Sequence, residues 1–240
     1  MRVFARDVVG STNAEAFALA QAGECGPFWV TARAQTAGRG RRGRSWTSDP
    51  GNLYTSLLLS DPSPPVHAAE LSFVAALAAH DAVSEVTGLA RRLTIKWPND
   101  LLCDGAKLVG ILIEGQGPSV VIGIGINCAH HPAGTPYPAT DLATRGVSVS
   151  PERLFEALAP AMQRRLAQWD RGAGFASIRA DWLARAVGIG DEVHVATTER
   201  DVHGRFEGID DAGCLMLRLP DGRIEAIAAG DVFPLAVEAR

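Results

Sequence analysis

The chain is 240 residues long, and its 47% apolar and 21% charged residues are proportions typical of a globular protein with a sizeable core, which excludes a disordered chain. Its 23 basic and 27 acidic side chains give a net charge of −4, a weak electrostatic footprint for a nucleic-acid-binding protein. No apolar run reaches the roughly 18 residues of a membrane-spanning helix, and the N-terminus lacks the apolar stretch of a signal peptide. We therefore predict a cytoplasmic protein with no membrane partner.

The first half of the chain predicts a helix, two strands and a second helix. Residues 10–23 form the first helix, because Thr12 and Glu15 match a capping box and Gly23 suits its end. Residues 28–35 and 52–59 read as strands on either side of an arginine-rich loop. Residues 66–87 are apolar nearly all round, which predicts a buried helix that ends at Gly88.

The second half predicts short strands, two helices and a β-rich tail. Adjacent antiparallel strands are expected at 93–97, 101–103, 107–114 and 120–127, because β-type runs alternate there with tight turns. Residues 151–169 and 175–186 have helical patterns. From residue 189 the pattern changes to short alternating strands with turns at 210–213 and 220–222, which is typical of a small β-barrel module.

The cysteines and histidines indicate no metal or redox site. Cys25, Cys103, Cys128 and Cys214 are far apart and form no C-x-x-C pair, so we predict buried, small apolar side chains. The histidines show no H-E-x-x-H pattern. A transition-metal site is therefore not expected.

The most informative segment is the loop from Gln35 to Trp46, in which residues 38–44 are four arginines and three glycines. Guanidinium groups bind carboxylate and phosphate oxygens bidentately, and glycines let a backbone approach a ligand closely. We therefore predict an anion-binding loop. Three other interpretations are a dinucleotide-binding glycine fingerprint, a nucleic-acid patch and a solvated basic loop. The first requires the last glycine, Gly43, to open a helix, whereas residues 44–51 read as loop.

Other polar residues follow predicted strands. Lys96 and Asp100 flank a tight turn, Lys107 begins an apolar strand that contains Gly110, and Asn127 ends a strand with glycines at alternate positions. Taken singly, these features also suit an exposed turn, a solvated strand end and ordinary packing. Together with the arginine loop they describe a cationic pocket, with an aspartate that could bind magnesium. Such a pocket suits activation of a carboxylate by a nucleotide, because fixed cations cancel the repulsion between the two acids.

Four separated motifs then resemble one family. The segments Gly-Arg-Gly-Arg-Arg-Gly-Arg-x-Trp, Lys-Trp-Pro-Asn-Asp, Lys-Leu-x-Gly-Ile-Leu-x-Glu and Gly-Ile-Gly-Ile-Asn, in this order, resemble the bacterial biotin protein ligases. The resemblance implies an α+β fold, with a mixed-sheet catalytic domain of the biotin/lipoate ligase type at 1–187 and an SH3-like β-barrel at 188–240. It also implies two half-reactions, in which biotin and ATP form biotinyl-5′-AMP and biotin then passes to a lysine of a carrier domain.

The resemblance implies roles for individual residues. Lys107, Arg41 and Asp100 are the expected catalytic residues, and Lys107 would bridge the biotin carboxylate and the α-phosphate. The expected biotin-binding residues are Ser11, Thr12, Asn13, Gln35, Gly38, Arg39, Gly40, Arg41, Lys107 and Gly110. The expected ATP- or adenylate-binding residues are Arg39, Arg41, Arg42, Arg44, Trp46, Lys96 and Asn127, with Trp46 stacking on adenine. Asp100 is the expected ligand of Mg²⁺.

The implied partner is the biotin carboxyl carrier domain of acetyl-CoA carboxylase, and the chain is expected to be a monomer or weak homodimer. Some members of the family carry a winged helix-turn-helix before the catalytic domain, whereas here the Ser-Thr-Asn motif starts at Ser11. We therefore expect no nucleic-acid partner and no repressor activity. Two alternatives stay open, namely a lipoate or octanoate ligase or transferase, which lacks the arginine loop, and a non-catalytic nucleic-acid-binding module.

Overall fold

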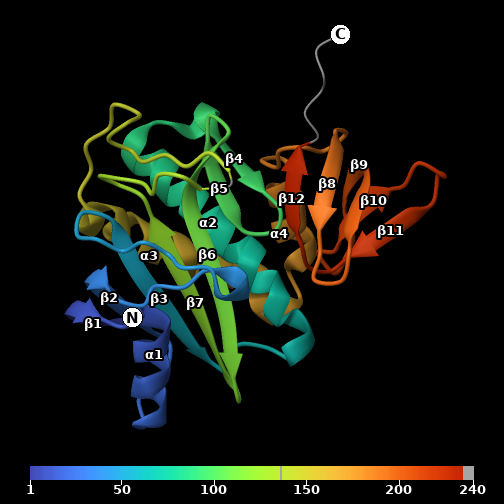
Figure 1. Ribbon diagram of the computed structural model, residues 1–240. Coiled ribbons are helices and arrows are strands. Elements are labelled where there is room, and N and C mark those ends of the chain that lie inside the picture. The colour runs from blue at the N-terminus through green and yellow to red at the C-terminus, as the bar shows by residue number, and fades with distance from the viewer. Residues whose placement is uncertain (136, 235–240) are drawn as a thin grey trace.

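The computed structural model describes residues 1–135 and 137–234, and its larger part is built on a seven-stranded mixed sheet (Figure 1). The strands are β1 (Arg2–Val9), β2 (Phe28–Gln35), β3 (Leu53–Ser60), β4 (Leu93–Lys96), β5 (Asp100–Cys103), β6 (Ala106–Gln116) and β7 (Ser119–Ile126), in the spatial order β1-β2-β3-β7-β6-β5-β4. The pair β1 and β2 is parallel, and the other pairs are antiparallel. The mixed sheet expected for the first domain is therefore confirmed.

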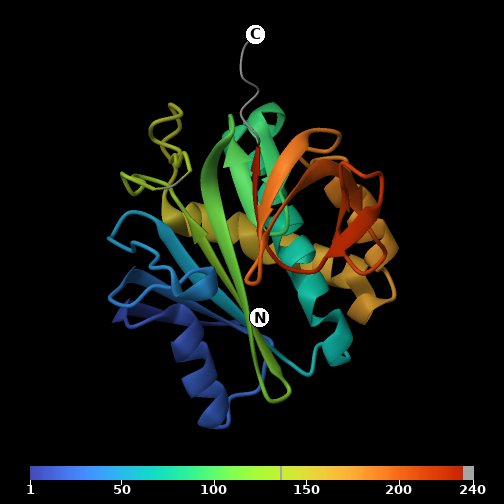
Figure 2. The ribbon, with the colours of Figure 1, turned by 45° about the vertical axis from the view of Figure 1, so that its right-hand side comes forward.

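The two faces of this sheet are covered differently, as Figures 1 and 2 show. Helix α1 (Thr12–Gln21) lies on one face, while α2 (Leu71–Thr87), α3 (Pro151–Trp169) and α4 (Phe175–Leu183) lie on the other. Alternate residues of β2 face opposite sides of the sheet and meet different helices. Trp29 joins the large core with α2 and α3, whereas Phe28 and Val30 pack against Ala16 of α1. Since α1 covers only part of its face, the rest of that face is available for a site.

The helix boundaries differ from the predictions in detail. The helix expected at 66–87 begins as a 3-10 helix, Pro65–Glu70, before α2, and it ends as predicted at Gly88, whose φ is +70°. The capping box predicted for α1 is wrong. Ser11 is the residue that precedes the helix, and Glu15 pairs with Arg6 at 2.9 Å instead of returning to the cap.

The C-terminal part is a five-stranded antiparallel sheet, as the β-rich tail predicted. Its strands are β8 (Glu192–Ala196), β9 (Asp201–Ile209), β10 (Leu215–Arg218), β11 (Ile224–Ile227) and β12 (Asp231–Pro234), in the order β11-β10-β9-β8-β12. This small all-β unit is consistent with the expected SH3-like barrel. Residues 235–240 of the expected domain lie outside the described residues.

Two hydrogen bonds fasten this sheet to the larger part of the molecule. The indole nitrogen of Trp97 donates to the carbonyl of Gly213 at 3.0 Å, and the Nε of Arg179 donates to the carbonyl of Ile209 at 2.8 Å. Hydrophobic residues of both parts belong to one buried cluster. These contacts hold β12 beside the large sheet, where it contributes to the site described below.

Two further features differ from the sequence predictions. Strand β1 was not predicted, because its Arg and Asp residues obscure the alternation and it lies at the edge of the sheet. All four cysteines are free, but Cys25 is exposed and Cys214 half-buried, so only Cys103 and Cys128 are the buried apolar residues that we expected. Among the described residues, no helix combines the length and apolarity needed to cross a membrane.

Candidate active site

A cavity of about 560 Å³ opens on the face of the large sheet that α1 leaves uncovered. It brings together thirteen of the sixteen predicted site residues, namely Ser11, Thr12, Asn13, Gln35, Arg39, Gly40, Arg41, Arg44, Trp46, Asp100, Lys107, Gly110 and Asn127. Gly38, Arg42 and Lys96 do not line it, although all three contact residues that do. Residues as far apart in the chain as Ser11 and Asn127, 116 positions, thus meet at one place.

Glycines form the floor of the cavity. In β7, Gly123 and Gly125 face the cavity, while Ile122, Ile124 and Ile126 belong to the core on the opposite face. A Cβ atom on Gly125 would lie 2.6 Å from the indole nitrogen of Trp46, and one on Gly110 of β6 would lie 2.6 Å from the same ring. Trp46 therefore rests directly on the sheet. Gly125 and Gly110 are needed for this close approach, not merely for packing.

One end of the cavity is lined by uncharged polar groups. The Oε1 atom of Gln35 accepts hydrogen bonds from the backbone nitrogen of Thr12 at 2.8 Å and from its hydroxyl at 3.1 Å. Ser56 Oγ donates to Asn13 Oδ1 at 2.6 Å. Gln35 Nε2 donates to Ser48 Oγ, which in turn contacts the carbonyl of Trp46. This network holds the turn before α1 against the sheet and suits a compact polar ligand group.

The arginine loop is an ordered turn and not the start of an α-helix. Arg41–Gly43 form a tight turn in which Arg42 and Gly43 have φ values of +55° and +70°, and Arg44 then returns to extended backbone. The backbone of Arg39 pairs with that of Ser45, which closes the loop on itself. Gly38 is required at its base, because a Cβ atom there would lie 2.5 Å from the Trp46 carbonyl. Since Gly43 opens no helix, the dinucleotide-binding interpretation is excluded.

Three arginines of the loop converge on Asp231, the first residue of β12. Its carboxylate lies 3.1 Å from Arg44, 3.3 Å from Arg42 and 3.9 Å from Arg41, and its side chain is 16% exposed. Arg41 also donates to Asn99 Oδ1 at 3.2 Å and to the Gly230 carbonyl at 2.8 Å. Burial lowers the pKa of Arg41 more than the carboxylates of Asp231 and Asp100 raise it, and the guanidinium still remains charged. The loop is therefore anchored on an internal anion supplied by the C-terminal sheet.

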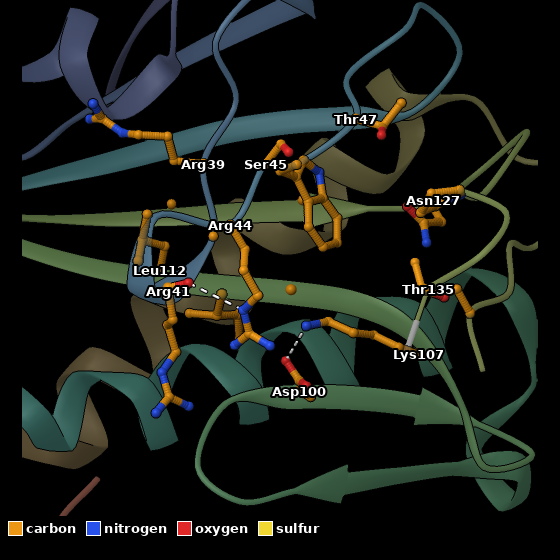
Figure 3. Close-up of a pocket in the computed structure, with 18 of the residues that line it drawn as sticks. Arg39, Arg41, Arg44, Ser45, Thr47, Asp100, Lys107, Leu112, Asn127 and Thr135 are labelled. Carbon is orange, nitrogen blue, oxygen red and sulfur yellow. Dashed lines mark hydrogen bonds and ion pairs between the residues drawn. The ribbon is translucent and has the colours of Figure 1, made fainter. Parts of the chain in front are cut away.

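A second charged cluster lies across the cavity from the arginine loop. Lys107 Nζ is 2.6 Å from Asp100 Oδ1, and Lys96 Nζ is 3.4 Å from Asp100 Oδ2. Figure 3 shows Lys107 and Asp100 pointing toward one another, with the guanidinium of Arg44 beside them. Burial raises the pKa of Asp100, but Lys107 and Lys96 lower it, and the net pKa is below its usual range. The cluster thus carries a net positive charge next to the cavity.

The loop that follows β7 closes the cationic side. Asn127 donates from Nδ2 to the carbonyl of Thr140 at 3.0 Å, which ties the end of β7 to this loop. The ring of Tyr137 lies 4.8 Å from Lys96 Nζ and 5.5 Å from Lys107 Nζ, and its hydroxyl accepts a hydrogen bond from Arg44 at 3.1 Å. An aromatic face near ammonium groups stabilises their charge. Tyr137 therefore joins both cationic clusters.

Several residues of the site were missed by sequence reasoning, namely Ser48, Ser56, Asn99, Glu114, Tyr137 and Asp231. Asn99 and Glu114 lie inside the quoted motifs, so their spacing was a usable signal. Ser48, Ser56 and Tyr137 are ordinary residues of strands and loops. Asp231 is about 190 residues from the arginines that it binds, and only the tertiary fold brings them together.

The arrangement provides a polar end, a glycine floor covered by an indole, and a cationic end. Arg41, Arg44 and Lys107 can cancel the charge of two acids held side by side, and the polar end can orient a head group. Among residues 1–135 and 137–234, no cluster of three or more His, Cys, Asp or Glu side chains could hold a metal ion. The geometry suits the joining of a carboxylate to a phosphate.

Known proteins resemble this chain over most of its length. The model of the Biotin/lipoate A/B protein ligase family matches residues 7–129, and that of the Biotin protein ligase C terminal domain matches residues 188–233. A biotin–[acetyl-CoA-carboxylase] ligase from Paracoccus denitrificans is 48% identical over 234 residues, which cover 93% of this chain and 96% of the relative.

Two solved structures share the fold. The biotin protein ligase of Aquifex aeolicus in complex with biotin and ATP has a TM-score of 0.85 at 25% identity, with 97% of each chain covered. The Leishmania major enzyme in complex with biotinyl-5-AMP has a TM-score of 0.68 at 28% identity, covering 95% of this chain and 99% of that one. Taken with the cavity and its motifs, these similarities show that the chain belongs to the Biotin/lipoate A/B protein ligase family and, within it, to the biotin protein ligases.

Proposed function

We propose that the chain is an ATP-dependent biotin protein ligase that acts in two steps. In the first, an oxygen of the biotin carboxylate attacks the α-phosphorus of ATP, the bond to pyrophosphate breaks, and biotinyl-5′-AMP forms. In the second, a lysine amine of a carrier domain attacks the acyl carbon and releases AMP. The observation that carries the proposal is the convergence of Lys107, Arg41 and Arg44 on a cavity whose other end presents the uncharged polar side chains of residues 11–13 and 35.

We assign the two ends of the cavity to the two substrates. The polar end formed by Ser11, Thr12, Asn13 and Gln35 would bind the biotin head, and Arg39, Gly40 and Gly110 are proposed as further biotin-side residues. Lys107 Nζ would bridge the carboxylate and the α-phosphate, while Trp46 would stack on adenine. The remaining phosphate-side contacts are proposed for Arg41, Arg42, Arg44, Lys96 and Asn127, with Gly38 shaping the loop.

The residues present do not fit a resident magnesium site. Asp100 and Asp231 are the acidic residues that line the cavity, and each already binds two or more cationic side chains. Mg²⁺ usually keeps waters and is held through one or two carboxylates together with substrate phosphates. We therefore propose that Mg²⁺ enters with ATP, held mainly by phosphate oxygens. The contacts of Asp100 give no support to its predicted role as a magnesium ligand.

We further propose the biotin carboxyl carrier domain of acetyl-CoA carboxylase as the protein substrate, a monomer or weak homodimer as the working form, and no nucleic-acid partner. The use of ATP favours the cytoplasm as the compartment. We also propose that the boundary between the catalytic and C-terminal domains lies between residues 187 and 188, within the segment that links α4 to β8.

The test incubates the purified chain with MgATP, an unmodified carrier domain, and either biotin, lipoate or octanoate. The expected result is that the mass of the carrier domain increases when biotin is the acid and does not change with lipoate or octanoate. Lipoate or octanoate transfer without biotin transfer would overturn the proposal and favour the alternative ligase.

The same assay applied to Lys107→Ala separates the ligase from a nucleic-acid-binding module. The side chain of Lys107 is 15% exposed, and its Nζ is already close to a buried carboxylate, so it is a preorganised electrostatic donor. Its removal is expected to cost about 2 to 4 kcal/mol of transition-state stabilisation in adenylate formation. Undiminished biotin transfer by this variant would contradict the assigned role.

A further inference from the structure

The side chain of Asn13 is held between two partners of opposite hydrogen-bonding character. Ser56 Oγ donates to its Oδ1 at 2.6 Å, and its Nδ2 donates to Glu114 Oε2 at 2.7 Å. Asn13 is 3% exposed, and a Cβ atom on Gly123 would lie 2.3 Å from Oδ1. The amide thus lies flat on the sheet at the polar end of the cavity, with little room to move.

Glu114 determines which way this amide is turned. An ionised carboxylate can only accept hydrogen bonds, so the amide nitrogen must face it and the amide oxygen must face away. The reversed amide would place Oδ1 against a carboxylate oxygen and lose a charge-assisted bond. Because a carbonyl oxygen has two lone pairs and Ser56 occupies one, Oδ1 keeps a second for a donor in the cavity.

The position of Glu114 in the sheet explains how it reaches both sides of the site. Residues 110, 112 and 114 of β6 share the face that bears the cavity, and Glu114 pairs in register with Val121, one row beyond the Leu112–Gly123 pair. Its second carboxylate oxygen lies 3.7 Å from Nη2 of Arg39 in the arginine loop. One partly exposed carboxylate therefore contacts both the turn before α1 and the loop that overlies it.

We propose that Glu114 is a specificity-determining positioning residue, which makes Asn13 an acceptor and so selects acids whose head group carries N–H donors. This inference rests on the proposed function, in which the head group is a cyclic urea. An acid with an alkyl chain or a dithiolane ring has no N–H donor and would leave Oδ1 unsatisfied, which is costly in a buried site. Glu114 itself need not touch the ligand.

The first test is Glu114→Gln, which keeps the size of the side chain but allows either end of the new amide to face Asn13. Binding of biotin, desthiobiotin and octanoate is measured by calorimetry without ATP. Biotin and desthiobiotin, which both contain the urea, are expected to bind about five- to tenfold more weakly, while the affinity for octanoate stays the same. Glu15→Gln is the matched control, because Glu15 lies on the same helix as Asn13 but pairs with Arg6 outside the cavity.

The second test is a rescue. In the double variant Asn13→Asp with Glu114→Gln, a carboxylate at position 13 accepts from an amide at position 114 and still presents an acceptor to the cavity. The preference for urea-containing acids should return, which a purely structural role for Glu114 does not predict.

The outcomes are separable. Three results would overturn the role of Glu114. Glu114→Gln could weaken the binding of all three acids equally, or it could bind biotin within twofold of the wild-type affinity. The folded double variant could also fail to regain the preference for urea-containing acids. Thermal unfolding of each variant identifies those that are folded, and a misfolded single variant leaves the double variant as the deciding measurement. If the wild-type chain itself does not bind biotin, the proposed function fails instead.

Discussion

The substitution Gly125→Ala tests whether Trp46 must rest on the glycine floor. The added methyl carbon would lie 2.6 Å from the indole nitrogen and 2.7 Å from the adjacent ring carbon, whereas ordinary contacts begin near 3.4 Å. The indole must therefore retreat by about 0.8 Å, the difference between 3.4 and 2.6 Å. Overpacking of this kind costs about 1 to 3 kcal/mol. Alanine in a strand recovers about 0.5 to 1 kcal/mol relative to glycine, so we expect the fold to persist.

We expect Gly125→Ala to weaken the binding of ATP. Stacking of a base on an aromatic side chain is worth about 1 to 3 kcal/mol, so a displaced Trp46 predicts a rise in the KM for ATP of about five- to 150-fold. The assay is biotin-dependent exchange of pyrophosphate into ATP, with ATP varied at saturating biotin. Gly110→Ala should act in the same direction, because its methyl carbon would also lie 2.6 Å from the Trp46 ring.

The matched control is Gly115→Ala in the same sheet. Its added methyl carbon would meet nothing closer than the Ser119 carbonyl, at 4.0 Å. This variant should keep the KM for ATP of the wild type. If Gly125→Ala and Gly115→Ala give KM values within twofold of one another, the reasoning about the glycine floor is refuted.

Two further predictions concern charged residues and stability. Asp231→Asn removes the anion shared by three arginines and should lower the free energy of unfolding of the ligand-free chain by about 1 to 3 kcal/mol, with a smaller loss at saturating ATP because phosphates then supply the anion. Urea unfolding with and without ATP measures both losses, and equal losses would contradict the prediction. At Asp81, burial raises the pKa, but the neighbouring His80 and the hydrogen-bonded Arg165 lower it to about 2 from 3.8. Because the folded-state pKa is the lower one, this carboxylate stabilises the fold above pH 3.8 and the contribution disappears as the pH falls to about 2. In Asp81→Asn, the free energy of unfolding should fall less steeply between pH 3.8 and about 2, by at most about 2 kcal/mol in total. If the acid dependence of unfolding is unchanged, the pairing of Asp81 with Arg165 contributes nothing to stability.

Local patterns predicted most of the elements because their signals are short in range. The strand at Phe28–Gln35 and the helix at Pro151–Trp169 have the predicted bounds, and Gly88 ends α2 in the left-handed conformation. Strand β1 was missed because an edge strand buries little of either face, and its charged residues break the alternation on which the prediction depends. The capping box failed because the backbone nitrogen and the hydroxyl of Thr12 both donate to Gln35 instead.

The candidate site was predicted as a set of residue types but not as a set of contacts. The arginine loop, Lys107 and the strand glycines indicated an anion-binding pocket, because their chemistry does not depend on where the rest of the chain lies. The partners of these residues were not predictable. Asp231 reaches the arginines only because Trp97 and Arg179 fasten the C-terminal sheet beside them.

The amino-acid sequence by itself determined the order of the elements, the cationic character of the pocket and the resemblance to a ligase family, since these depend on residues within one strand, turn or motif. Only the tertiary structure decided which charges meet. Glu114 orients Asn13 from 101 positions away, and Asp231 binds Arg42 from 189 positions away. Such pairings depend on how sheet faces and domains pack against one another. Hydrophobic burial drives this packing and is non-directional, so the local sequence pattern does not specify which residues meet.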